Sequence, residues 1–269
     1  MNDAQSPAAA PREIAYEVRL AQDERDLRAA QRLRYQVFVE ELGARCDGAD
    51  HAARLEQDAL DPYFDHLLLI DRNADSEALA HVVGVYRLLP QDRAEALGRF
   101  YSDTEYDLAP LRASGRKLVE LGRSCVHPAH RRGASMLLMW NGLADYVIAR
   151  GIEIMFGVAS FHGADPAPHA EALSWLNAHH LAPEGLRVTV RPGPQAQRMD
   201  LIDPAALDRT RALAAIPPLI RAYLRLGGFV GQGAFIDHDF NTTDVCLIMD
   251  TSTMSERAFD FYTRKTPRG

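Results

Sequence analysis

The stretch from Leu118 to Leu138 holds the densest set of residues that could do chemistry, and its central letters are VELGRSCVHPAHRRGASMLL. The pattern predicts a strand, a tight turn and the start of a helix. The first backbone N–H groups of a helix are unpaired and bind anions such as phosphate. Arg131 and Arg132 add positive charge at this turn, and Gly133 leaves room for a ligand beside the backbone. This combination favours an anion-binding turn over a merely solvated basic face.

The wider segment 112–132 carries six basic residues against one acid, Glu120, which gives it a net charge of +5. The whole chain of 269 residues has a net charge of −7, which argues against a general nucleic-acid-binding protein because such proteins neutralise phosphates. The basic segment is therefore a local feature, and a bound anion is the ligand that it indicates.

Glu120 lies in the predicted strand 117–126, where alternate residues share a face. If that face lines a cleft, the carboxylate could accept a proton from an incoming ammonium, directly or through a water. A structural salt bridge with Arg123 or Arg87 is an equally good interpretation from the sequence. For Cys125, a small buried thiol is a better interpretation than a nucleophile activated by a histidine.

Further acids could hold a cationic substrate. Asp58 and Asp61 precede a predicted strand, although helix capping and turn formation would also explain them. Asp165 follows the predicted strand 152–159, at the position where open sheets place ligands. The histidines around Asp165 match no metal-binding spacing, and the three cysteines form no CxxC pair, so no metal site is predicted.

The elements that must position these residues form an α/β pattern, a mixed sheet with helices on both faces. The pattern predicts a hairpin formed by strands 66–70 and 81–88. It also predicts a βαβ crossover formed by strand 117–126, helix 136–150 and strand 152–159. The remaining predicted strands are 14–20, 186–190 and 244–249, and the remaining predicted helices are 23–42, 92–100, 169–180, 217–226 and 254–264.

The expected organisation is a disordered tail over residues 1–13, rich in Ala and Pro, and a single domain over 14–269. Residues 170–269 would elaborate the C-terminal side of that domain. Neither a signal peptide nor a membrane-spanning run is recognisable, so the expected location is cytoplasmic. Contact with the inner face of a membrane is left open. The helix 217–226 could touch lipid, but packing against the core is the favoured interpretation.

Three short motifs resemble a series shared by acyl-homoserine-lactone synthases and ornithine N-acyltransferases. They are Arg34-x-x-Val37-Phe38, Gly84-x-Tyr86-Arg87-Leu88-Leu89 and Glu120-x-x-Arg123-x-x-Val126. Four longer segments resemble the ornithine N-acyltransferases alone: GVASFHGADP at 157–166, ALSWLNAHHLAP at 172–183, PPLIRAYLRLGGFVGQGA at 217–234 and DHDFNTTDVCLIM at 237–249. The resemblance extends from about residue 16 to about residue 262.

This resemblance implies a GNAT-like acyltransferase fold and a reaction that moves a 3-hydroxyacyl group to the α-amine of ornithine, giving lyso-ornithine lipid. The implied donor is an acyl carrier protein with its phosphopantetheine thioester, and neither a metal nor a nucleotide cofactor is expected. The amine would attack the thioester directly, without an acyl-enzyme. The basic segment 112–132 would be the docking surface for the acidic carrier protein.

The resemblance also implies roles for individual residues. Glu120 and Arg123 would stand in the reaction cleft. From the chemistry of the residues themselves, we expect Glu120 to be the general base, the substrate carboxylate to lie near Arg87 or Arg123, and its side-chain ammonium to lie near Asp58, Asp61 or Asp165. Other implied substrate-site residues are Arg34 and Phe38. The residues that would face the pantetheine phosphate are Val126, Arg131, Arg132, Gly133 and Ala134.

One departure from the GNAT pattern bears on the donor. The usual loop reads Gln/Arg-x-x-Gly-x-Gly/Ala, whereas this chain has His130 at the first position and Ser135 at the last. The departure argues against the pyrophosphate of acetyl-CoA and suits a carrier with a single phosphate.

Three other functions stay open from the sequence. The first is the same reaction on glutamine or lysine. The second is a homoserine-lactone synthase, which fits less well because Gly43-Ala44-Arg45 stands where those proteins typically keep a Trp. The third is a non-catalytic module that binds acyl carrier protein, against which the intact Arg87, Glu120 and Arg123 count.

Overall fold

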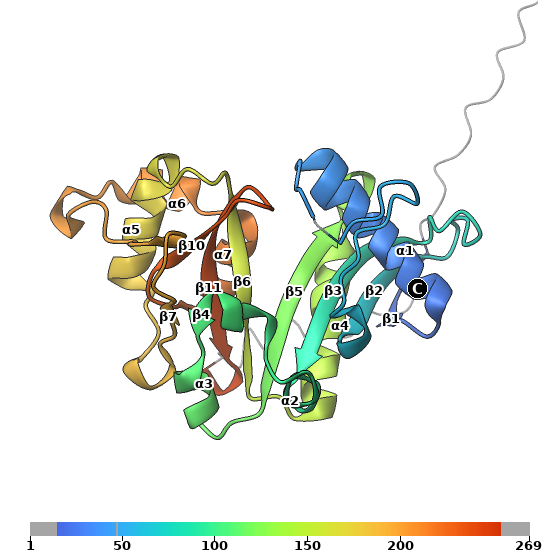
Figure 1. Ribbon diagram of the computed structural model, residues 1–269, viewed down its shortest axis with the longest axis horizontal. Coiled ribbons are helices and arrows are strands. Elements are labelled where there is room, and N and C mark those ends of the chain that lie inside the picture. Colours follow the sequence, from blue (N-terminus) through green and yellow to red (C-terminus); the bar gives the residue numbers. More distant parts are fainter. Residues whose placement is uncertain (1–14, 47, 254–269) are drawn as a thin grey trace, which may run out of the picture.

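The computed structural model describes residues 15–46 and 48–253, so the predicted tail 1–13 and the predicted last helix 254–264 lie outside the described residues. One large sheet runs through the described part of the chain (Figure 1). Its strands, in spatial order, are β1 (Tyr16–Leu20), β2 (Asp65–Asp71), β3 (Val82–Pro90), β5 (Leu118–Val126), β6 (Ile154–His162), β11 (Thr242–Asp250), β10 (Ala234–Asp237) and β8 (Ala196–Gln197), and β9 (Phe229–Val230) also pairs with β11.

The strand pairing confirms the predicted hairpin and the predicted crossover. Strands β2 and β3 are antiparallel neighbours. Strands β5 and β6 are joined through α4 (Ser135–Arg150) and pair in parallel, and every other neighbouring pair in this sheet is antiparallel. A separate small ribbon pairs β4 (Tyr106–Asp107) with β7 (Thr189–Val190).

The other helices begin and end where local signals place them. In α1 (Glu24–Arg34) the Asp23 side chain accepts a hydrogen bond from the Asp26 N–H, and α4 ends at Gly151, whose positive φ forms a left-handed cap. The remaining helices are α2 (Gln91–Leu97), α3 (Ala109–Ala113), α5 (Ala170–His179), α6 (Arg209–Ala215) and α7 (Pro218–Arg225).

Helices α1 and α4 cover opposite faces of the sheet around β2, because alternate residues of a strand point to opposite sides. Leu68 and Ile70 pack in the cluster that contains Leu33 of α1. Leu67 and Leu69 pack in the cluster that contains Met139 of α4. Figure 1 shows the two helices on either side of this half of the sheet, with α5, α6 and α7 on the other half.

Two predictions change in detail, and a third is confirmed. The predicted helix 23–42 is α1 followed by a π-helix (Tyr35–Glu41). The predicted strand 186–190 shrinks to β7, because Glu184–Leu186 forms a 3-10 helix. Helix α7 buries Ile220 and Tyr223 in the core, which confirms the core-facing interpretation. Within the described residues, no helix is both long enough and apolar enough to span a bilayer.

Strands β5 and β6 separate partway along their length, and this separation prepares the site. They pair only from Leu118 to Glu120 on β5, although β5 continues to Val126 and β6 to His162. A bulge adds to the distortion, since Arg123 and Ser124 together oppose one residue of β3, and Arg123 takes a φ of 48°. Figure 1 shows the two strands diverging.

Candidate active site

A cavity of about 270 Å³ lies where β5 and β6 diverge. Residues 120–124 of β5 and 155–160 of β6 form its two sides. Much of the remaining wall is apolar, from Phe38, Phe64, Leu219, Leu247 and Met249. Such a mixture of an apolar wall and a few polar groups is typical of small-molecule sites.

A buried network of alternating charges lies beside the cavity. Arg34 is fully buried and donates to Glu56 and to Asp61, the latter at 2.8 Å. Arg87 donates to Asp58 at 2.6 Å and to Asp61 at 2.9 Å. Arg123 donates from Nε to Glu56 at 3.1 Å. The three arginines and the three carboxylates balance, and the arginines hold the pKa values of Glu56 and Asp61 below their usual range despite burial.

The five predicted substrate-site residues Arg34, Phe38, Asp58, Asp61 and Arg87 fall into two groups. Arg87 and Phe38 line the cavity. Arg34, Asp58 and Asp61 do not line it, and their charges are directed to one another and to Arg87. They therefore hold Arg87 in position instead of facing a substrate. The contact of Asp58 or Asp61 with a substrate ammonium stays a prediction, because both carboxylates are paired with arginines and neither lines the cavity.

Asp165 also lies away from the cavity. It is exposed beyond the end of β6, and its side chain accepts a hydrogen bond from the Ala167 N–H at 3.0 Å. This is a turn-capping role. The predicted contact of Asp165 with the substrate is therefore not supported by its position.

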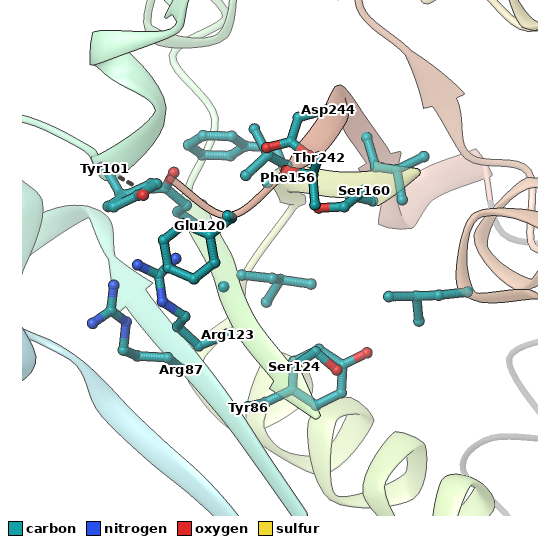
Figure 2. A pocket seen from close by; sticks show the side chains of 18 of the residues that line it. Tyr86, Arg87, Tyr101, Glu120, Arg123, Ser124, Phe156, Ser160, Thr242 and Asp244 are labelled. Atoms are coloured by element: carbon teal, nitrogen blue, oxygen red, sulfur yellow. Dashed lines mark hydrogen bonds between the residues drawn. The ribbon is translucent and has the colours of Figure 1, made fainter. Parts of the chain in front are cut away.

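Glu120 and Arg123 both line the cavity (Figure 2). Strict alternation along β5 would place them on opposite faces, and the bulge at Arg123 removes that alternation. The guanidinium of Arg123 lies over two aromatic rings, 4.2 Å from the centroid of Phe240 and 5.2 Å from that of Tyr101.

Glu120 forms none of the salt bridges considered from the sequence; it accepts hydrogen bonds from a neighbouring turn. The backbone N–H groups of Tyr101 and Ser102 donate to it at 2.6 Å and 2.7 Å, and the Ser102 hydroxyl donates as well. Burial raises the pKa of the carboxyl, although these hydrogen bonds favour its charged form. Glu120 therefore anchors the 3-10 helix Tyr101–Thr104 while one side of it faces the cavity.

Three more acids line the cavity, namely Glu105, Asp237 and Asp244. Glu105 follows the turn that Glu120 anchors, and its Oε2 has no hydrogen-bond partner among the described residues. The same holds for Oδ1 of Asp244 on β11. Burial and the neighbouring acids raise the pKa of Glu105 well above its usual range, and burial raises the pKa of Asp244 to about 6.

The predicted phosphate-binding turn lies at the N-terminus of α4. Gly133 adopts a φ of +85°, a conformation that favours glycine, and Ala134 caps the helix without a side-chain hydrogen bond. Arg131 donates to the Val126 carbonyl and forms an ion pair with Glu41, whereas Arg132 is exposed. The first N–H groups of α4 are thus not capped by a side chain.

The basic segment 112–132 does not form one surface. Arg112 and Arg116 lie near the start of β5 and pair with Asp103 and Asp250. Arg131 and Arg132 follow the other end of β5, roughly 25 Å away for a nine-residue strand. The basic residues are thus divided between the two ends of β5, and only the group near α4 lies at the predicted anion-binding turn; docking of a carrier protein on them stays a prediction.

Two other features bear on the chemistry. Cys125 is buried among Leu68 and Val85, and burial raises the pKa of its thiol to about 12, so it is a core residue and not a nucleophile. Among the described residues, no three His, Cys, Asp or Glu side chains are grouped so that they could hold a metal ion.

Sequence reasoning missed Glu56, Tyr101, Glu105 and Asp244 as site residues. Asp244 carried a signal, because a charged residue within the apolar strand TTDVCLIMD is unusual unless it is paired or functional. Glu56 belongs to the same acidic stretch as Asp58 and Asp61. Tyr101 and Glu105 gave no such signal, because only the turn held by Glu120 brings them to the cavity.

Comparison with known proteins shows the family of the chain. Residues 33–141 match the acetyltransferase (GNAT) domain family. The chain is 63% identical over 258 residues to the L-ornithine N(alpha)-acyltransferase of Rhodobacter capsulatus, an alignment that covers 96% of this chain and 98% of that protein. It is 42% identical over 248 residues to the protein of the same name from Agrobacterium fabrum, which covers 91% of this chain and 84% of that protein.

Among solved structures, the CoA-dependent acyl-homoserine lactone synthase MesI matches with a TM-score of 0.50 at 14% identity, covering 94% of this chain and 97% of that chain. This likeness concerns the fold alone and, together with the GNAT domain match, confirms the predicted GNAT-like fold. The long alignments to the Rhodobacter and Agrobacterium proteins show that the chain is an acyltransferase and belongs to the family of L-ornithine N(alpha)-acyltransferases.

Proposed function

We propose that this protein transfers a 3-hydroxyacyl group from acyl carrier protein to the α-amine of L-ornithine and so forms lyso-ornithine lipid. The observation that carries the proposal is the cavity between β5 and β6, which combines arginine donors, unpaired carboxylates and an apolar wall. An amino acid and a fatty acyl chain together require these three kinds of surface. The names of the relatives supply the amino acid.

The substrate carboxylate is proposed to bind at Arg123, with Arg87 beside it. Arg123 donates from Nε to Glu56 and also hydrogen-bonds the Tyr101 side chain, and the remaining N–H groups of its guanidinium could bind a ligand. Arg87 lines the same cavity, and its Nε has no hydrogen-bond partner among the described residues. A carboxylate at this position would supply the missing acceptor.

The chemistry is proposed as direct aminolysis of a thioester. The α-ammonium loses a proton to Glu120, directly or through a water, and the free amine attacks the thioester carbonyl. A C–N bond forms and the C–S bond breaks, and the thiol of the phosphopantetheine arm leaves after taking up a proton. The raised pKa of Glu120 suits a proton acceptor. No acyl-enzyme is needed, in keeping with the burial of Cys125.

The donor is proposed to approach along the N-terminus of α4. The phosphate of the phosphopantetheine arm would accept hydrogen bonds from the uncapped N–H groups after Gly133, and Arg132 would add a positive charge. Arg131 would act indirectly, because its ion pair with Glu41 and its bond to Val126 fix the turn.

The direct test is turnover of the purified protein with 3-hydroxyacyl carrier protein and a panel of free amino acids, read by mass spectrometry. We expect N-acylornithine that is absent without the carrier protein. A parallel reaction with 3-hydroxyacyl-CoA separates the two donor classes. A product with glutamine or lysine instead would change the acceptor, and no product with any amino acid would refute the proposal.

A further inference from the structure

Two carboxylates in the cavity wall lack the partners that buried charges require. Glu105 and Asp244 are 4% and 3% exposed, and each keeps one oxygen without a hydrogen-bond partner among the described residues. Burying an unpaired polar group costs stability, so native structures almost always supply a partner. Both oxygens belong to side chains that line the cavity, which points to a ligand as the partner.

The neighbouring charges do not meet this need. The three arginines of the buried network are balanced by Glu56, Asp58 and Asp61. The hydrogen bonds of Glu120 come from the turn at Tyr101 and Ser102. Asp237 is half-buried, lines the same cavity and adds a further negative charge. This side of the cavity therefore carries an excess of negative charge.

A third acceptor completes the group. The buried hydroxyl of Thr242 makes no hydrogen bond of standard geometry, although it and the Ser160 hydroxyl lie close enough to the Asp244 carboxylate to interact with it. Thr242 and Asp244 are two residues apart on β11 and thus share a strand face, and Ser160 lies opposite Asp244 on β6. Figure 2 shows Asp244, Thr242 and Ser160 together, away from Arg87 and Arg123. Glu105, Asp244 and the Thr242 hydroxyl together offer acceptor oxygens to the three N–H donors of a primary ammonium.

We propose that Glu105 and Asp244, helped by Thr242, bind the side-chain ammonium of the amino-acid substrate and so select a cationic amino acid over a neutral one. This inference rests on the proposed function, because it names the subsite that recognises the acceptor. The carboxylate of the substrate lies at Arg123, its side chain extends toward β11, and its α-amine lies between them near Glu120. Glutamine carries no charge and would leave the two carboxylates unneutralised.

The test compares ornithine with norvaline, which has the same carbon chain without the terminal amine. Asp244→Asn and Glu105→Gln remove the charges with little change in shape. Asp145→Asn and Glu184→Gln are matched controls, because both residues are exposed and outside the cavity. We expect each cavity variant to lower the ratio of kcat/KM for ornithine to that for norvaline roughly 10- to 100-fold, the range of a charge-assisted hydrogen bond. The controls should leave the ratio unchanged.

A purely structural role would lower turnover of both amino acids alike, and unchanged ratios in the cavity variants would overturn the subsite. If one variant fails to fold, as judged by circular dichroism, the other and Thr242→Val answer the same question. A second readout is the rise in Tm that ornithine produces in the unmodified protein, which should shrink in the cavity variants. If the unmodified protein makes no N-acylornithine, the proposed function fails, whereas the ratios test the subsite alone.

Discussion

Replacing Glu56 with glutamine is the sharpest test of the buried charge network. Glu56 is 1% exposed and bridges Arg34 and Arg123, two arginines that would otherwise have fewer acceptors. Glutamine preserves the shape but removes the charge, and its amide group adds donors where the arginines already donate. The network would then hold three positive charges against two negative ones.

The expected destabilisation follows from the burial. Removing one partner from a buried ion pair costs about 3–5 kcal/mol, because the remaining charge stays buried without compensation. Glutamine keeps an acceptor oxygen, so we expect the lower end of this range. At about 2–4 °C per kcal/mol for a domain of this size, the Tm should fall by roughly 6–12 °C.

Thermal unfolding followed by circular dichroism measures this change, and Glu40→Gln is the matched control. Glu40 pairs with Arg54 on the surface, where both side chains are more than a third exposed, so its loss should cost less than about 1 kcal/mol. If the Tm of Glu56→Gln lies within about 2 °C of that of the unmodified protein, the buried arginines do not need the charge of Glu56, and the reasoning is refuted.

Other predictions concern pH, the base and the donor. Because the folded-state pKa values of Glu56 and Asp61 are lowered, their stabilisation is fully present above the ordinary pKa of about 4.5 and is lost gradually as pH falls from there toward the lowered folded-state values, so the Tm deficit of Glu56→Gln should begin to shrink below about pH 4.5. The pKa of Asp244 is raised to about 6, so its ionisation destabilises the free protein as pH rises. Asp244→Asn should therefore increase the free energy of unfolding at about pH 8 by up to about 3 kcal/mol, seen as a higher Tm, and by much less at about pH 5. Glu120→Gln should lower kcat about 10²- to 10⁴-fold and flatten the acidic limb of the pH–rate profile; an effect confined to the KM for ornithine would make Glu120 a positioning residue for the turn before Glu105. Arg132→Glu should raise the KM for acyl carrier protein roughly 10-fold and leave the KM for ornithine unchanged, as measured at two salt concentrations.

Local patterns predicted the frame of the site. The hairpin β2–β3 and the crossover from β5 through α4 to β6 follow from apolar runs and turn residues that are close in sequence. The approach of Glu120 to a cleft follows from its place on β5. The left-handed Gly133 before α4 follows from a turn signal that glycine supplies.

Other parts of the site depend on contacts between distant residues and could not be predicted in this way. Asp61 is paired with Arg34 and Arg87 across 27 and 26 positions of the chain, which a linear reading of LEQDALDP does not show. The bulge at Arg123 depends on how β3 aligns with β5. For that reason the sequence did not show that Asp58 and Asp61 are paired with arginines, or that Glu105 and Asp244 line the cavity instead.

The two sets of charges at the cavity differ in what they cost the free protein, and the difference indicates their roles. Arg34, Glu56 and Asp61 compensate one another, so their arrangement persists without a ligand and holds Arg87 and Arg123 in place. Glu105 and Asp244 lack such compensation, and their pKa values are raised because the charged form of a buried, unpaired carboxyl is unfavourable. A cation that enters the cavity would relieve this repulsion, so part of the binding energy for a cationic amino acid would already be stored in the free fold. Improved stability and weakened recognition of ornithine should therefore appear together in Asp244→Asn, a pairing that a residue with only a structural role would not produce.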